Sequence, residues 1–129
     1  MPFVSSTKLP KIELFPGAMS GIIAGEQIMF SFLEMEEGSQ VPAHSHPHEQ
    51  AGLVLEGKLQ FKIGTEEKVM GPGDAFIVPA NMVHSGTVLE GPAKVLDAFS
   101  PLREDYLESY NKYTQISGNT IWDYLTVKH

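Results

Sequence analysis

The sequence contains no cysteine, few basic residues and no long apolar run, and each absence excludes a class of protein. Without cysteine the chain forms neither disulfides nor thiolate metal sites, as is common in a reducing cytoplasm. Sixteen acidic residues outnumber nine basic ones, and the basic residues are scattered rather than gathered in a stripe. At a net charge of −7, nucleic acid and an anionic membrane surface are therefore poor partners.

The beginning of the chain and its hydropathy give no sign of export or membrane insertion. The first ten residues lack the basic-then-apolar order of a signal peptide, and no run approaches the ~20 apolar residues that span a bilayer. We therefore expect a cytoplasmic protein. Its 129 residues are enough for one domain with its own apolar core. No internal repeat or low-complexity linker divides the sequence, so we expect a single domain over 1–129.

Short apolar runs separated by glycine and proline dominate the chain up to about residue 100. Twelve glycines and nine prolines punctuate runs rich in Val, Ile, Leu and Phe, at 28–33, 53–55, 59–63, 75–78 and 95–99. Runs of this length and spacing favour an all-β sandwich or barrel over about 12–100. Tight turns are predicted at 56–58, 64–67 and 71–74, because glycine allows a positive φ and proline fixes φ.

The C-terminal extension, about 101–129, has a different pattern. Ser100 and Pro101 resemble an N-cap and a first helical residue, which predicts a short amphipathic helix over about 101–113. The tyrosines of this helix are interpreted as packing residues. Residues 120–127 could form a strand or a helix, and in either case Trp122 and Leu125 should cover part of the barrel or of a neighbouring subunit.

Four of the five histidines lie between positions 44 and 84. His44 and His46 are two residues apart, so on a strand their side chains share one face, and Gln50 has the same parity. His84 follows a separate strand. Three imidazoles from two strands and one oxygen ligand can surround an octahedral metal ion and leave positions open, as in a catalytic site.

Two neighbours of Gln50 are weaker candidates. His48 also has even parity, but Pro47 should disturb the strand, so we interpret His48 as a residue of the pocket rim rather than a ligand. Glu49 has the opposite parity, so alternation should turn it towards solvent. Three neutral imidazoles and a neutral amide leave the charge of a bound metal uncompensated, which suits Lewis-acid chemistry.

Two spaced motifs resemble those of the cupin family. The stretch Gly38-x5-His44-x-His46-x3-Gln50-x6-Gly57 matches the first cupin motif, with Gln50 where the family usually has glutamate. The stretch Gly73-x5-Pro79-x-Asn81-x2-His84 matches the second, with Asn81 in place of the usual glycine and Val88 in place of the final asparagine. Asparagine also visits the left-handed region, so that exchange is tolerable.

The resemblance implies a fold and a cofactor. The fold would be a double-stranded β-helix, a jelly-roll-like barrel, often found as a homodimer. One divalent transition metal, which could be Ni, Zn, Mn, Fe or Co, would lie inside the barrel on His44, His46, Gln50 and His84. Most oxygen-using cupins carry a carboxylate ligand that this chain lacks at Gln50, which disfavours oxidation.

A second group of residues follows the motifs. By alternation Asp97 and Phe99 share a strand face with Val95, and a carboxylate facing the barrel interior is costly unless it is paired, ligating or catalytic. Arg103 follows about one helical turn later and could fold back over the barrel mouth. A structural ion pair between Asp97 and Arg103 is the alternative, and Phe99 could be ordinary core.

The sequence HPHEQ at 46–50 and the pattern D-x-F-S-P-x-R-E-D at 97–105 resemble the KdgF family of small cupins. This similarity, over about 38–107, implies conversion of 4,5-unsaturated uronate sugars to linear keto forms by metal-assisted hydration and ring opening. Asp97 would be the acid/base, Arg103 the anchor for the substrate carboxylate and Phe99 a wall of the pocket. His48, placed at the pocket rim by its position in the sequence, is a further candidate for substrate binding. A cupin dioxygenase or other oxidoreductase, and a non-catalytic metal-dependent sugar-binding module, are the alternatives.

Overall fold

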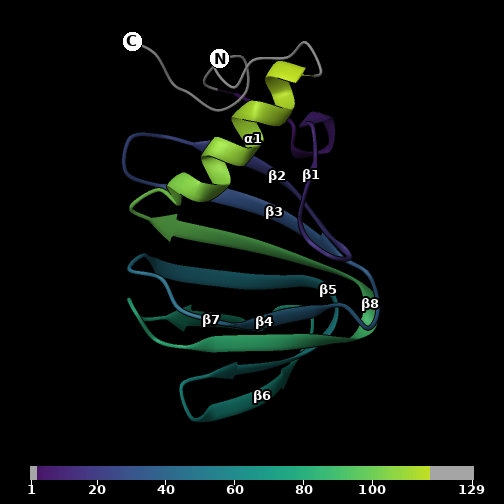
Figure 1. Cartoon of the computed structure of the whole chain (residues 1–129). Helices are drawn as coiled ribbons and strands as arrows, with labels where there is room; N and C mark the ends of the chain where they lie inside the picture. Colours follow the sequence, from purple (N-terminus) through teal and green to yellow (C-terminus); the bar gives the residue numbers. More distant parts are fainter. Residues whose placement is uncertain (1–2, 117–129) are drawn as a thin grey trace.

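The computed structural model describes residues 3–116, and its strands form one antiparallel sheet rolled into a barrel (Figure 1). This architecture, with a short helix after the last strand, confirms the expected all-β fold class. Within these residues no helix is long and apolar enough for a bilayer span. The elements in chain order are the 3-10 helix η1 (Ser6–Lys8), β1 (Ile12–Phe15), β2 (Ala18–Ala24), β3 (Met29–Met35), β4 (Gln40–His44), β5 (Glu49–Ile63), β6 (Glu66–Met70), β7 (Ala75–Val78), β8 (His84–Ser100) and α1 (Glu104–Ile116).

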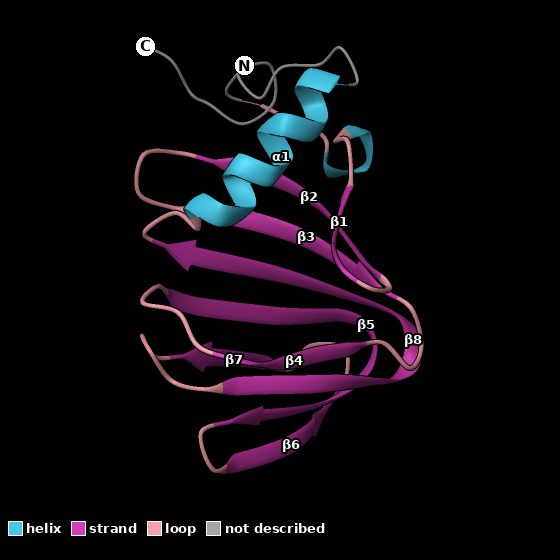
Figure 2. Cartoon of the chain, in the orientation of Figure 1, coloured by secondary structure: helices cyan, strands magenta, loops and turns pink. Residues whose placement is uncertain are grey.

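Two long strands, β5 and β8, form the backbone of the barrel. They pair from Glu49 opposite Ser100 to Ile63 opposite His84. The C-terminal half of β8 also pairs with β3, and its N-terminal half pairs with β4. The sheet therefore runs β1-β2-β3-β8-β5-β6, with β4 beside β8 and β7 beside β5. Figure 2 shows these strands curving around an interior, with α1 lying across β1 and β2.

Alternation along the strands fills this interior with apolar side chains. Val54, Val78 and Val95 are buried in the main cluster, and burial of one such side chain stabilises the fold by about 1.5–3 kcal/mol. A second cluster lies under α1, where Phe99 and Tyr110 pack with residues of β1, β2 and β3. The Tyr110 hydroxyl donates a hydrogen bond to the Pro10 carbonyl, which ties α1 to the segment before β1.

The turn predicted at 56–58 is wrong, because β5 continues through it. Gly57 has a φ of +82°, and the register between β5 and β8 shifts around it, so it is a bulge within a strand. The other two predicted turns are confirmed. Gly64 and Thr65 connect β5 to β6, and in the turn before β7 the Gly71 N–H donates to Asp74 Oδ2 at 2.9 Å.

The helix begins later than its sequence pattern indicates. Ser100 pairs with Glu49 as the last residue of β8, and its hydroxyl donates to the Gln27 carbonyl at 3.1 Å, so it is not an N-cap. The first helical hydrogen bond runs from the Leu107 N–H to the Arg103 carbonyl at 3.1 Å. The predicted start at 101 is therefore wrong by three residues. Trp122 and Leu125 lie outside the described residues.

The bulge at Gly57 generates a stability prediction with a matched control. Gly57 and Gly38 have φ values of +82° and +81°, but their surroundings differ. A Cβ atom at Gly57 would lie 2.7 Å from the Glu90 carbonyl oxygen and 2.8 Å from Ala93 Cα, whereas one at Gly38 would meet no described atom within 4 Å.

Gly38→Ala should therefore lower the free energy of unfolding by about 1–2 kcal/mol, the cost of a left-handed backbone. Gly57→Ala should lose a further ~1–3 kcal/mol because the added methyl group overlaps backbone atoms of β8. Urea denaturation of both variants measures the difference. Equal losses would show that the contact between β5 and β8 relaxes freely at this point.

Candidate metal centre

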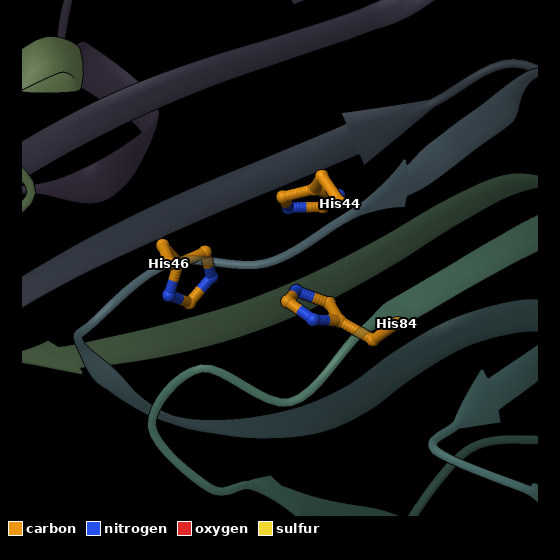
Figure 3. Close-up of side chains that lie close together, drawn as sticks. All are labelled: His44, His46 and His84. Atoms are coloured by element: carbon orange, nitrogen blue, oxygen red, sulfur yellow. The ribbon is translucent and has the colours of Figure 1, made fainter.

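Three imidazole side chains converge inside the barrel (Figure 3). His44 ends β4, and His84 begins β8 as its direct cross-strand partner. His46 lies in the connection between β4 and β5, so the expectation that it shares a strand with His44 is wrong. One ring nitrogen from each histidine nevertheless lies within 4.8 Å of the others. The predicted grouping is therefore present, although a loop supplies one of its members.

Each of these rings is oriented by a backbone carbonyl on its Nδ1 side. A carbonyl oxygen only accepts hydrogen bonds, so each Nδ1 carries the proton and each Nε2 keeps a lone pair. His84 Nε2 is buried and has no hydrogen-bond partner among residues 3–116. Such a set of oriented lone pairs fits a metal ion. The three contacts are His44 Nδ1 to Pro42 O at 2.7 Å, His46 Nδ1 to His48 O at 3.1 Å and His84 Nδ1 to Met82 O at 2.9 Å.

The electrostatics of the site keep two of these imidazoles neutral. Burial lowers the pKa of His46 to about 4, and the nearby charges of Arg103 and His84 act in the same direction. Burial also lowers the pKa of His84, and this effect outweighs the hydrogen bond to the Met82 carbonyl, which acts to raise it. Neutral imidazole is the form that ligates metals, so neither ring has to lose a proton near pH 7 before it binds one.

Gln50 places an amide oxygen beside the imidazoles. It is buried while Glu49 is exposed, which confirms the predicted strand register. Gln50 Oε1 lies 3.2 Å from His46 Nε2, and with His46 protonated on Nδ1 neither atom has a proton to share. Two such lone pairs repel each other unless a cation lies between them. Two ligands at right angles on one ion, each ~2.1 Å from it, are roughly 3 Å apart, so the contact fits a shared cation.

The barrel interior contains a cavity lined by His44, His84 and Gln50, and Asp97 lines it as well, as alternation along β8 predicts. Its side chain is buried, and its Oδ1 accepts a hydrogen bond of 3.2 Å from Gln50 Nε2. Burial raises the pKa of Asp97 to about 7, although the bond from Gln50 and the charge of Arg103 act to lower it. A carboxyl group with such a pKa can both give and take a proton near neutral pH.

Arg103 is the only arginine of the chain, and it reaches this cavity from the residue before α1. Its ion pair is with Asp105: Nε donates to Oδ1 at 3.2 Å, and Nη2 donates to Oδ2 at 2.7 Å. The Asp97–Arg103 ion pair that the sequence allowed is therefore replaced by a local one. Sequence reasoning missed Asp105, although the R-E-D pattern that contains both residues was visible.

The remaining predicted residues differ in their relation to the cavity. Phe99 belongs to the buried core and also lines the cavity, with its ring centroid 5.8 Å from that of His46. Tyr106, interpreted from sequence as a packing residue, lines the cavity as well. His48 is not among the lining residues, and its ring is tilted by 57° to that of His46, with the two centroids 5.4 Å apart. Most of the other described residues that line the cavity are apolar, among them Leu33, Met35, Val41, Leu59, Phe61, Phe76, Val88 and Val95.

The convergence of Nε2 atoms generates a prediction for metal content. His84→Ala should abolish binding of a divalent metal, because it removes one of the three ring nitrogens that lie within 4.8 Å of one another. His48→Ala is the matched control: it removes a neighbouring imidazole but keeps the backbone carbonyl that orients His46. Elemental analysis of both purified variants measures the bound metal. Wild-type metal content in His84→Ala would rule out this donor set.

Comparison with known proteins agrees with this geometry. Residues 31–99 match the family model of the cupin domain. Over 100 residues the chain is 30% identical to the pectin degradation protein KdgF of Dickeya dadantii, covering 76% of this chain and 91% of that protein. The structure of KdgF from Halomonas sp. matches with a TM-score of 0.76 and 29% identity over 81% of this chain and 98% of that one. An RmlC-like cupin from Shewanella frigidimarina matches with a TM-score of 0.76 and 26% identity over 81% and 94% of the two chains. The chain is thus a member of the cupin family and a relative of KdgF.

Proposed function

We propose that this cupin is a metal-dependent enzyme that converts 4,5-unsaturated uronate sugars into their linear keto forms. The observation that carries the proposal is the meeting of three kinds of group on one cavity: histidine donors, the buried carboxyl of Asp97 and the cation of Arg103. Similarity to a protein named for pectin degradation supports a uronate as substrate. A cytoplasmic location remains part of the proposal.

The metal would be held by His44, His46, His84 and Gln50. Bound there, a divalent ion such as Ni, Zn, Mn, Fe or Co supplies Lewis acidity towards a substrate oxygen. The donors are all neutral, so they leave the charge of the ion available to the substrate. The carbonyl contacts at each Nδ1 hold the rings in this arrangement.

Asp97 would carry the protons of the reaction. Water adds across the C4=C5 double bond, so that C4 gains a proton and C5 gains a hydroxyl group. The hemiketal at C5 then opens, and a ketone remains at C5. We assign to Asp97 the delivery of a proton to C4 and the acceptance of a proton from water, because its carboxyl group lines the cavity and is oriented by Gln50.

Arg103 would hold the substrate carboxylate. In a protein with a net charge of −7, an anionic substrate needs a local positive group. Arg103 is the only cationic lysine or arginine among the described residues that line this cavity. The buried ring of Phe99 lies beneath it as a rigid wall, with the centroid 5.3 Å from the guanidinium carbon. His48 would contribute at the rim.

Two other functions make different predictions. An oxidoreductase would need oxygen or another oxidant, whereas hydration and ring opening need none. A sugar-binding module would bind a uronate without turnover. The buried carboxyl of Asp97 favours the enzyme, because a binding module has no use for an acid whose charge is costly to bury.

We also propose that two copies of the chain pair through the outer face of β3, β8, β5 and β7. Two adjacent cross-strand rows of this face are wholly apolar: Phe30, Ala98, Ala51 and Ile77 form one, and Phe32, Leu96, Leu53 and Ala75 form the other. In the next row Lys94 pairs with Glu56 at 3.7 Å, and Glu34 pairs with Lys11 at 3.2 Å. This border is locally neutral, and on the other side of the two rows the exposed Glu49, opposite Ser100, is the one acidic residue of the adjoining pair.

This pairing predicts a dimer with a mass near twice 14.2 kDa. Leu53→Lys should give monomers, because it places a charge in the centre of the apolar rows. Val69→Lys, on β6 and away from these rows, is the control: Val69 is 51% exposed and Leu53 36%. Sedimentation equilibrium measures the masses. A monomeric wild-type protein, or a dimeric Leu53→Lys variant, would contradict the proposed interface.

The assignment of Asp97 predicts that Asp97→Asn loses about 10²- to 10⁴-fold in turnover, the usual contribution of a general acid–base group. Asparagine can still accept the bond from Gln50, so metal content and melting temperature should stay unchanged. Asp74→Asn, in an exposed turn, should keep full activity.

Turnover of an unsaturated uronate, followed by the loss of absorbance of its conjugated double bond, is measured with and without oxygen. Wild-type activity should be the same in both conditions, whereas loss without oxygen would favour the oxidoreductase. A stable, metal-loaded Asp97→Asn protein with full activity would remove Asp97 from the mechanism. Binding of the sugar by a metal-loaded wild-type protein that shows no turnover would favour the binding module.

A further inference from the structure

Arg103 lies just before α1, and its guanidinium group contacts the second and third residues of that helix, Asp105 and Tyr106. We propose that Asp105 and Tyr106 are positioning residues, which fix the guanidinium group so that its end-on edge, formed by Nη1 and Nη2, is the one available to a substrate carboxylate. The inference rests on the proposed role of Arg103 as carboxylate anchor. It adds residues that touch the anchor rather than the substrate.

Asp105 occupies the side edge of the guanidinium group. Its two carboxylate oxygens accept from Nε at 3.2 Å and from Nη2 at 2.7 Å, which is a two-pronged pair. The Arg103 side chain is 9% exposed and that of Asp105 is 60% exposed, so Asp105 approaches from the solvent side. The partial burial of Asp105 acts to raise its pKa, but the Arg103 guanidinium outweighs this and lowers it. Asp105 therefore remains ionised and paired at neutral pH.

Tyr106 fixes the plane of the same group. The Arg103 guanidinium carbon lies 3.7 Å from the centroid of the Tyr106 ring, a cation–π contact. The Tyr106 ring packs edge-to-face on Phe99, with centroids 5.8 Å apart at 89°. Phe99 is 2% exposed and part of the core. The Arg103 guanidinium group therefore packs on Tyr106, and Tyr106 packs on Phe99, which is fixed in the core of the barrel.

This arrangement has two consequences for ligand binding. The side edge is already used, so a ligand carboxylate can form a two-pronged pair only with the end-on edge. The pair with Asp105 also keeps Arg103 from closing onto Asp97, although both residues line the cavity. The site should therefore select ligands that carry a planar carboxylate, and loosening Arg103 should weaken their binding while Asp97 and the histidines keep their positions.

The first test observes Arg103 directly and needs no substrate. Because the chain has one arginine, arginine-selective ¹⁵N labelling gives a single Nε–H resonance. Its hydrogen exchange should be slow in the wild-type protein and at least about tenfold faster in Asp105→Asn, where a bond to a charged acceptor is lost. Tyr106→Leu should also accelerate exchange, and Tyr106→Phe should accelerate it less, because it keeps the ring under the guanidinium group and loses only the hydroxyl that interacts with Arg103.

Glu104→Gln is the matched control, because it removes an equal charge from the same first turn of α1. Its exchange rate should equal that of the wild type. Equal rates in Asp105→Asn and Glu104→Gln would overturn the positioning role of Asp105. Equal rates in Tyr106→Leu and Tyr106→Phe would overturn that of Tyr106.

The second test separates binding from chemistry in the metal-loaded full chain. With an unsaturated uronate, Asp105→Asn should raise KM about tenfold and leave kcat within about twofold, since one charged hydrogen bond contributes on that order. Glu104→Gln should change neither. A fall in kcat with unchanged KM would contradict the inference. A wild-type protein without turnover would refute the proposed function, while the exchange rates would still decide whether Asp105 and Tyr106 position Arg103.

Discussion

The pairing of β5 with β8 is the interaction on which the rest of the structure depends. It sets Gln50 opposite Phe99, Gly52 opposite Asp97 and Ile63 opposite His84. The side chains of Gln50, Asp97 and His84 are all buried, so this one pair of strands turns all three into the interior. A slip by one residue would turn all of them outwards, because side chains alternate between the two faces of a strand. The bulge at Gly57 allows the two strands to stay paired while the register changes between the halves of the barrel.

The parts of the site that follow from strand parity could be predicted from the sequence. Gln50 rather than Glu49 faces inwards, and Asp97 shares the inner face with Phe99, because both choices depend only on alternation within one strand. The role of Gly57 could not be predicted. A glycine with positive φ serves a hairpin turn and a strand bulge equally well, and only pairing with the distant β8 distinguishes them. Ser100 is a similar case, since its hydroxyl is already bonded to the distant Gln27.

The partner of Arg103 also had to come from the structure. Asp97 and Asp105 are both close enough in the sequence to pair with it, and local pattern does not choose between them. Burying two charges together carries a desolvation penalty that their attraction often fails to repay. A pair with Asp105, which keeps one partner in contact with solvent, lowers that penalty. It also leaves Asp97 and Arg103 as separate groups on one cavity, which a buried ion pair between them would have prevented.

The same reasoning explains why a glutamine stands at position 50. One amide meets two different demands there: its oxygen faces His46 Nε2 at 3.2 Å, and its N–H₂ group donates to Asp97 at 3.2 Å. A glutamate could supply the oxygen but has no N–H to give. It would instead bring a second carboxylate against Asp97 in a buried place, and two such groups hold a proton between them rather than ionise together. Glutamine at position 50 is thus the residue that lets the metal donor proposed here and an independent buried acid lie side by side, so the departure from the usual cupin glutamate and the presence of Asp97 are two parts of one arrangement.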